Sequence, residues 1–212
     1  MRHVTPLLLG IIMLSSTAWA QEPARVGLFF DAGFAAPQSI TFKNTWGTGV
    51  IGEGGATFVL TNWFALQAVV GHGRFAVSEA AIRDQLTSYA SADAAVDVLG
   101  GEISTWSFLG EAKISLSGNP NDVVPYAIAG VGMAHVTEAP STIRLIYQGE
   151  LYDEQKTTGS SSSDTTVSVG AGVDVPVKER VRFFAEARYQ IILKEYESLE
   201  HVGLRAGFRL SF

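Results

Sequence analysis

Histidine chemistry is the first kind of activity that this sequence could support. Beyond the first 20 residues it has His72, His135 and His201, which lie far apart and show neither the His-Glu-x-x-His motif nor the i, i+4 spacing of a zinc site. His201 follows Glu197 and Ser198, so a base, a nucleophile and an acid of the hydrolase kind occur close together there. We expect no catalytic site and no metal site, and keep His201, Ser198 and Glu197 as the catalytic alternative.

Other kinds of chemistry have less support. The glycine-rich stretches 52–55 and 130–132 do not continue into Gly-Lys-Ser or Gly-Lys-Thr, so they do not predict nucleotide binding. The sequence contains no cysteine, which excludes disulfides and thiolate ligands. With 21 acidic and 15 basic residues the net charge is −6, a poor basis for binding nucleic acid. No cofactor and no nucleic-acid partner is therefore expected.

Alternation of apolar and polar residues dominates the sequence after residue 20. From His201 to Phe212, one face is Val, Leu, Ala, Phe, Leu and Phe, and the opposite face carries His, Gly, Arg, Gly, Arg and Ser. A period of two predicts strands with one apolar face. Eight such segments are predicted: Arg25–Phe34, Gly49–Leu60, Trp63–Phe75, Ile103–Leu116, Val124–Val136, Thr165–Val177, Val181–Leu193 and His201–Phe212.

The connections between these segments alternate in length. Short turns lie at 61–62, 117–123 and 178–179, whereas the connections 35–48, 78–102 and 137–164 are long. Short periplasmic turns and long extracellular loops are typical of outer-membrane barrels. We therefore predict an all-β fold: an eight-stranded antiparallel up-and-down transmembrane β-barrel.

The polar face of the strands is the predicted lumen. It combines small residues, which suit the interior of a narrow barrel, with charges of both signs. A soluble barrel would instead turn the apolar face inward, and the charges would then be solvated. The charges expected to pair in the lumen, together with Asp31, are Glu53, Glu111, Lys113, Asp174, Glu186, Arg188, Arg205 and Arg209.

The last eight residues, Arg205 to Phe212, resemble the C-terminal assembly signal of bacterial outer-membrane proteins, with Gly207, Leu210 and Phe212 at its defining positions. The stretches 124–132 and 169–173 are similar to strands of the OmpA-type and OmpX-type barrel family. The resemblance implies a Gram-negative outer membrane, insertion by the assembly machinery and contact with lipid and lipopolysaccharide. It does not imply one activity, because the family includes structural proteins, adhesins and lipid-modifying enzymes.

We expect a non-enzymatic, monomeric protein that maintains the envelope or makes contacts at the cell surface. A lipid A-modifying enzyme and a narrow solute or ion pore are the alternatives. The family's lipid A deacylases use a His-x-Ser-Asn element, which this sequence does not contain.

Several local features are also predicted. Residues 1–20 have the basic start, apolar run and small residues of a cleaved signal peptide, which leaves 21–212 as one barrel domain. A bulge is expected near Gly130–Gly132 and a mobile tip at Gly159–Ser163. Within 78–99, one or two short helical turns or an extension of the strands beyond the bilayer are equally expected. Trp46, Trp63 and Trp106 are expected in an interfacial girdle.

Overall fold

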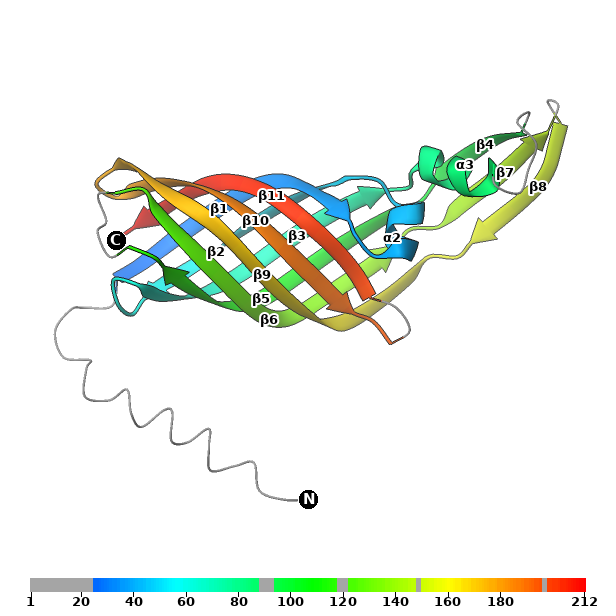
Figure 1. Cartoon of the computed structure of the whole chain (residues 1–212). Coiled ribbons are helices and arrows are strands. Elements are labelled where there is room, and N and C mark those ends of the chain that lie inside the picture. Colours follow the sequence, from blue (N-terminus) through cyan, green and yellow to red (C-terminus); the bar gives the residue numbers. More distant parts are fainter. Residues whose placement is uncertain (1–24, 88–93, 118–121, 148–149, 196–197) are drawn as a thin grey trace, which may run out of the picture.

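The computed structural model describes residues 25–87, 94–117, 122–147, 150–195 and 198–212, and the predicted signal peptide lies outside this part of the chain. Eight strands form a closed antiparallel barrel in the order β1-β11-β10-β9-β6-β5-β3-β2 (Figure 1). These strands are β1 (Arg25–Pro37), β2 (Gly49–Val59), β3 (Phe64–Ala76), β5 (Glu102–Ser115), β6 (Val124–Glu138), β9 (Ser160–Lys178), β10 (Val181–Leu193) and β11 (Ser198–Ser211).

The predicted barrel is confirmed, and the first and last strands close it. β1 pairs with β11 from Gly27 opposite Ser211 to Pro37 opposite His201. The beginning of β1, the C-terminus and the short turns lie at one end of the barrel (Figure 1). Because outer-membrane barrels keep their short turns periplasmic, we assign this end to the periplasm and the opposite end to the cell exterior.

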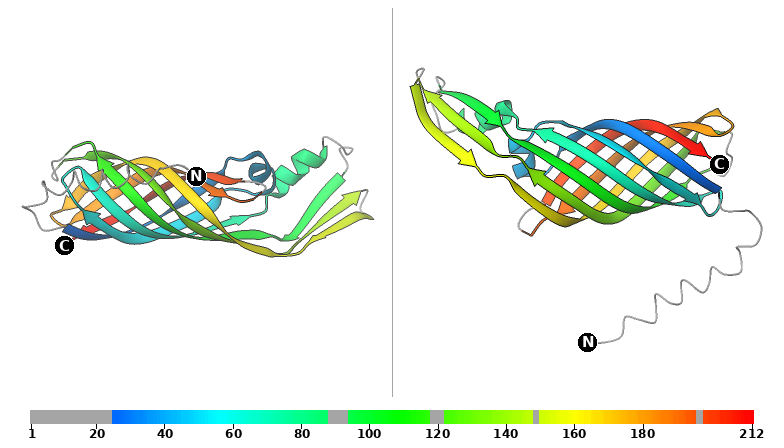
Figure 2. Two further views of the ribbon diagram at one scale, coloured as in Figure 1. Left: turned by 90° about the horizontal axis from the view of Figure 1, so that it is seen from below. Right: turned by 180° about the vertical axis from the view of Figure 1, so that it is seen from behind.

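The long connections fold into structure of their own beyond the extracellular end. The first contains the helix α2 (Ile40–Thr45), and the second contains the helix α3 (Glu79–Thr87). A three-stranded sheet, here called the projecting sheet, has the order β4 (Ala94–Gly100), β7 (Ser141–Tyr147) and β8 (Glu150–Thr157). It extends away from the barrel at an angle (Figures 1 and 2). Of the two alternatives expected for 78–99, the described residues show both: the helix α3 in the first half and the strand β4 from Ala94 onward.

Gly100 and Gly101 separate the projecting sheet from the barrel. Their φ angles of 73° and 82° lie in the region that favours glycine, and they bend the chain between β4 and β5. A Cβ atom on Gly101 would lie 2.4 Å from Val77 Cγ2. The chain also bends at Pro140, between β6 and β7. This bend lies beside Gly101, because the Gly101 amide donates a 3.2 Å hydrogen bond to the carbonyl of Pro140.

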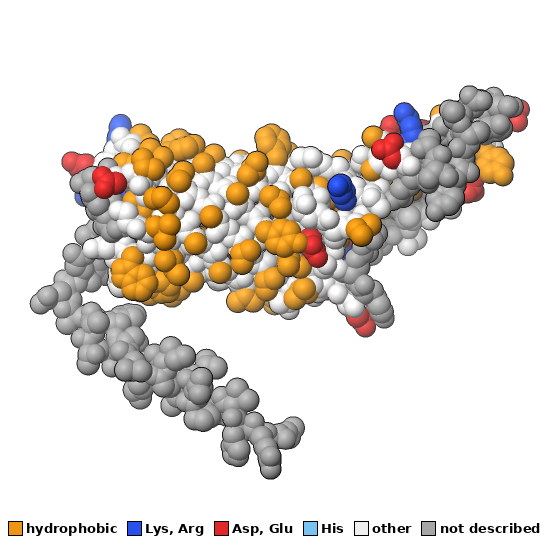
Figure 3. Space-filling model, viewed as in Figure 1, with side chains coloured by type: hydrophobic (Ala, Val, Ile, Leu, Met, Phe, Trp, Pro, Cys, Tyr) orange, Lys and Arg blue, Asp and Glu red, His pale blue; other side chains and the backbone are white. Residues whose placement is uncertain are grey.

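The outer surface of the barrel carries an apolar band. Exposed side chains such as Phe30, Phe108 and Leu204 cover it, and the charged side chains visible on this face gather towards its two ends (Figure 3). Trp63 and Trp106 are about half exposed on this surface, as a girdle requires. Trp46 was wrongly predicted to join them, because it packs against a buried apolar cluster at the extracellular end.

Two further predictions were wrong. β6 keeps an unbroken register with β5 and β9 through Gly130–Gly132, so there is no bulge there. The alternation within Val124–Val136 assigns Tyr126 and Ile128 to the apolar, outward face, but both are buried and face the lumen. The bulge is expected from the sequence because apolar and polar residues stop alternating there. The alternation is interrupted because this strand carries apolar residues on both faces.

The prediction of a mobile tip at Gly159–Ser163 is also wrong, because its four serines belong to a strand. Ser160 to Ser163 begin β9 and pair with Glu138 to His135 of β6. Serine is compatible with such a strand because the backbone makes the ladder, whatever the side chain. No helix in the described residues has the length and apolar character needed to cross a membrane.

Candidate functional site

The barrel interior holds the charged residues, because alternate positions of every strand point inward. All eight of the predicted lumen charges, and Asp31, lie in the interior, where the Glu53 side chain is 5% exposed and each of the others is 8% exposed or less. They come from six of the eight strands, and the tertiary structure divides all nine between two clusters.

The central cluster is organised by Arg188. Its Nη1 atom lies 2.6 Å from Glu111 Oε1 and 3.0 Å from Glu53 Oε2, and its Nη2 atom lies 2.8 Å from Glu186 Oε1. Arg205 pairs with Glu53, and its side chain also lies within 4.0 Å of Glu186 and Asp31. The cluster is therefore Asp31, Glu53, Glu111, Glu186, Arg188 and Arg205, with four carboxylates around two guanidinium groups.

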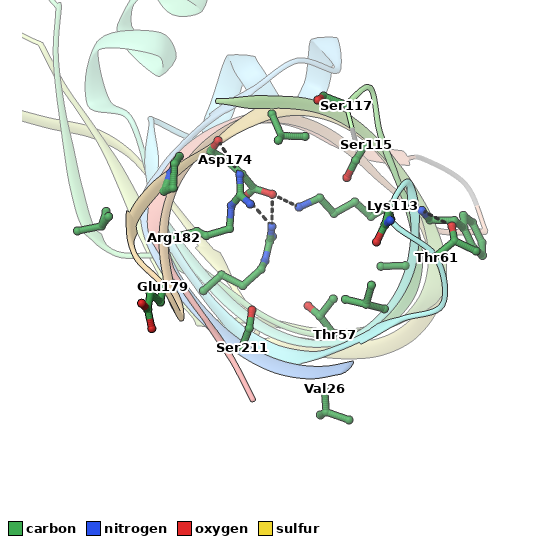
Figure 4. A pocket seen from close by; sticks show the side chains of 18 of the residues that line it. Val26, Thr57, Thr61, Lys113, Ser115, Ser117, Asp174, Glu179, Arg182 and Ser211 are labelled. Carbon is green, nitrogen blue, oxygen red and sulfur yellow. Dashed lines mark hydrogen bonds and ion pairs between the residues drawn. The ribbon is translucent and has the colours of Figure 1, made fainter. Parts of the chain in front are cut away.

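The vestibule cluster lies nearer the periplasmic end and is organised by Asp174. Arg209 Nη1 lies 2.6 Å and 2.9 Å from the two Asp174 carboxylate oxygens, and Lys113 pairs with the same carboxylate. Arg182 donates to the backbone carbonyls of Asp122 at 2.9 Å and of Asp174 at 3.4 Å. Figure 4 shows the Lys113 side chain pointing towards Asp174. The cluster of Lys113, Asp174, Arg182 and Arg209 carries three cations and one carboxylate.

Tyr126 joins the two clusters. Its hydroxyl donates a 3.0 Å hydrogen bond to Glu186 of the central cluster. The Lys113 ammonium of the vestibule cluster lies 3.9 Å from the centre of the same ring, and Arg209 lies 4.8 Å from the ring of Phe184. Cations over aromatic faces are stabilised by the ring quadrupole. Sequence reasoning missed this residue because it assigned Tyr126 to the outer face.

The lumen is nearly balanced in charge overall, but the charge is separated along the barrel axis. The central cluster has a formal charge of −2, because four carboxylates oppose two guanidinium groups, and the vestibule cluster has +2, because three cations oppose Asp174. Removing one partner from such buried pairs leaves an uncompensated charge, which typically costs about 3–5 kcal/mol.

The extracellular end of the lumen is closed by an apolar plug. Phe42 of α2 is 2% exposed and lies against Phe75, with ring centres 5.1 Å apart. Its buried members are Ala35, Phe42, Ile51, Phe75, Ile103, Ala134, Val136, Ile192 and Leu199, with Trp46 packed against them. The sequence could have indicated this plug, because its strand residues fall at positions that point into the barrel.

The periplasmic end of the lumen is hollow. A cavity of about 480 Å³ is lined by turn residues such as Thr61 and Lys178, and by Lys113, Asp174 and Arg209 of the vestibule cluster (Figure 4). The lumen therefore consists of an apolar plug, the central cluster and then a vestibule that begins at the periplasmic turns.

The structure does not assemble the alternative catalytic group. His201 faces the lumen, 5% exposed, with its ring 5.5 Å from Phe75. Ser198 lies on the opposite face of β11 and donates a 2.7 Å hydrogen bond to Glu200, while Glu197 lies outside the described residues.

The remaining histidines bind serines rather than one another. The His72 ring nitrogen lies 3.0 Å from Ser104 Oγ, and His135 Nδ1 lies 3.0 Å from Ser163 Oγ. The described part of the chain holds no group of three or more His, Asp or Glu residues that could bind a metal.

The residues of the terminal signal also have structural positions. Leu210 and Phe212 lie on the outer side of the barrel, and the Phe212 amide donates a 2.9 Å hydrogen bond to the Val26 carbonyl. Gly207 faces inward, where a Cβ atom would lie 2.1 Å from the Phe30 carbonyl oxygen. Glycine at this position therefore permits the close approach of β1.

Comparison with known proteins gives a family. The sequence model for the outer membrane protein beta-barrel domain matches residues 7–212, whereas no curated protein matches the chain. The chain therefore belongs to the outer membrane protein β-barrel family and is located in the outer membrane.

Three solved structures are reported as similar to this chain. Neisserial surface protein A (NspA) is 18% identical, with a TM-score of 0.56, over 90% of this chain and all of that one. Ail of Yersinia pestis, solved with the heparin analogue sucrose octasulfate, is 13% identical, with a TM-score of 0.47, over 89% of this chain and all of Ail. The outer membrane protease OmpT of Escherichia coli is 9% identical, with a TM-score of 0.46, over 92% of this chain and all of OmpT. At 18% identity, the likeness to NspA concerns the fold alone.

Proposed function

We propose that this outer-membrane barrel is a non-enzymatic surface protein that makes contacts through its projecting sheet. The observation that carries the proposal is the exposure of β8. Seven of its eight residues are exposed, and Leu151 and Tyr152 are 57% and 76% exposed. Large apolar and aromatic groups held away from the membrane have no role in anchoring the barrel, but they suit contact with another molecule.

A β-bulge presents Tyr152. Leu145 and Ile146 of β7 pair with Asp153 and Leu151 of β8, so Tyr152 is an extra residue without a partner across the strand pair. A bulge of this kind bends the strand and redirects a side chain. Tyrosine is favoured at binding surfaces because it combines a large apolar ring with a hydroxyl.

The edge of the projecting sheet is built to avoid extension by another strand. Within the described strands β8 pairs with β7 alone, and this free edge carries the bulge and the charged residues Glu150, Asp153, Glu154 and Lys156. Bulges and charges protect edge strands against strand-to-strand pairing. The proposed contact is therefore made by side chains such as Tyr152.

The filled lumen argues against a conducting pore. An ion crossing it would have to pass both the apolar plug around Phe42 and the paired charges around Arg188. Planar-bilayer recording of the refolded protein tests this point. Steady single-channel conductance that changes in an Arg188→Gln variant would favour the pore instead.

The separation of Ser198 from His201 argues against a hydrolase that uses these two groups. Mass spectrometry of lipid A from cells with and without the protein tests for catalysis. We expect the same lipid A species in both. A deacylated or acyl-shifted product that disappears in a His201→Ala variant would overturn the non-enzymatic proposal.

The contact role is tested by adhesion of cells that display the protein. The double variant Leu151→Ser, Tyr152→Ala removes the apolar groups of β8. The control is Ile40→Ser on α2, which removes a 79% exposed apolar group from the same end of the barrel. We expect adhesion to host cells or immobilised matrix to fall in the double variant alone. Unchanged adhesion across a panel of surfaces, with equal display, would refute the contact role.

A further inference from the structure

We propose that the periplasmic vestibule is a binding site for a small oxyanion with two negative charges, such as a phosphate group or a dicarboxylate. The cavity of about 480 Å³ is large enough for such an ion. It begins at the periplasmic turns and reaches the vestibule cluster of Lys113, Asp174, Arg182 and Arg209 (Figure 4). This inference is independent of the contact role proposed for the extracellular end.

The charge of the cavity selects an anion. Its lining includes Lys113, Arg182 and Arg209 from the vestibule cluster, and Asp174 is the carboxylate that opposes them. At the rim, Lys178 and Glu179 offset each other. The remaining formal charge of +2 matches a dianion.

Arg209 places a buried and fixed guanidinium group at the site. It is 94% buried, and its Nη1 atom is bound to Asp174, while its Nε atom has no hydrogen-bond partner among the described residues. Arg209 lines the cavity, and charge-assisted hydrogen bonds from a guanidinium to an oxyanion are stronger than neutral ones. The planar guanidinium also has the geometry that oxyanions prefer.

The rest of the lining is neutral and polar. Thr57, Thr61 and Ser115 place hydroxyl groups along the wall, and hydroxyls can donate to an oxyanion without changing the charge of the cavity. The wall therefore adds donors to the cationic end.

The structure also explains why the anion would bind and not pass through. The rings of Tyr126 and Phe184 lie beside the cations of the vestibule. Beyond Tyr126 lies the central cluster, where four carboxylates exceed two guanidinium groups. Like charge disfavours an anion at the level of the central cluster. The vestibule is therefore a pocket that is open towards the periplasm and closed at its inner end.

The test is calorimetric titration of the refolded mature protein in zwitterionic detergent with inorganic phosphate at pH 7.5 and constant ionic strength. Succinate and sulfate are the other dianions, and chloride is the control for ionic strength. We expect saturable binding of one or more dianions and no saturable binding of chloride. Phosphate and succinate separate a phosphate-bearing from a dicarboxylate ligand.

Variants locate the binding. Arg182 lies near the rim and bonds to backbone carbonyls, so Arg182→Gln should fold and weaken binding roughly tenfold, a typical effect of losing one charge-assisted contact. Asp174→Asn should strengthen binding, because the net charge of the cavity rises. Arg74→Gln removes the same kind of charge from the outer surface at the extracellular end and should change nothing.

Heat-modifiable gel migration checks that each variant is folded. If folded wild-type protein binds none of the dianions, or if Arg182→Gln and Arg74→Gln bind as the wild type does, the proposed site is wrong.

Discussion

The hydroxyl of Tyr126 donates a 3.0 Å hydrogen bond to Glu186, although the two residues are 60 positions apart. The bond connects two clusters of opposite net charge, since the Tyr126 ring also lies 3.9 Å from Lys113. A change at Tyr126 should therefore affect the whole lumen.

Tyr126→Phe removes this bond and keeps the ring. Hydrogen bonds to charged groups contribute about 1.5–3 kcal/mol, so the free energy of unfolding should fall by roughly that amount. Urea titration in lipid vesicles, followed by tryptophan fluorescence, measures it. The control is Tyr152→Phe, whose side chain is 76% exposed. Equal stability of both variants would mean that the Tyr126–Glu186 bond contributes nothing.

Arg188→Met leaves Glu53, Glu111 and Glu186 without the guanidinium that they share. Unfolding should become easier by about 3–5 kcal/mol, because buried carboxylates lose their counter-charge. Adding Glu111→Gln should restore part of the stability. For comparison, Arg74→Gln at an exposed ion pair should change stability by about 1 kcal/mol or less.

Gly101→Val should disturb the projecting sheet and leave the barrel intact. Its φ of 82° is strained for a β-branched residue, and the added Cβ would meet Val77 at 2.4 Å. Limited proteolysis should cut the β4–β8 region faster while gel migration of the barrel is unchanged. Gly47→Ala, where a Cβ would make an ordinary 3.7 Å contact, serves as the control. Wild-type proteolysis of the Gly101→Val variant would show that the bend does not require glycine.

We expect Glu154 to make the projecting sheet sensitive to acid. Hydrogen bonds from Lys156 and Arg144 hold the pKa of the Glu154 carboxyl below its ordinary value of 4.5. A lowered folded-state pKa stabilises the sheet above the unfolded-state value, and this contribution is lost as the pH falls through the folded-state pKa. Proteolysis of β7–β8 should therefore accelerate only below pH 4.5. In a Glu154→Gln variant this acid-dependent step should be absent, and an identical profile would contradict the assignment.

Phe212→Asp tests the predicted assembly signal. Phe212 is 70% exposed at the periplasmic end, so an aspartate there removes no packed core. Outer-membrane fractions should contain less folded protein, as measured by heat-modifiable migration. Ser211→Asp, one position away, is the control for added charge. Equal amounts of wild-type and Phe212→Asp protein would show that the terminal aromatic residue is not needed.

The sequence by itself determined the barrel strands and the inward position of the charges. The side-chain period of a strand is two, so an alternating segment such as His201–Phe212 assigns each residue to a face before its neighbours are known. The same rule misplaced Tyr126, because a strand that is apolar on both faces contains no phase signal.

The tertiary structure alone decided which charges meet and what the long connections become. Arg188 contacts Glu53 across 135 positions because the stagger of the strands around the barrel sets which inward positions share a level. The projecting sheet likewise takes β4 from one connection and β7 and β8 from another. Pairing between distant segments depends on the closed barrel that brings them together, and no local pattern in either segment specifies it.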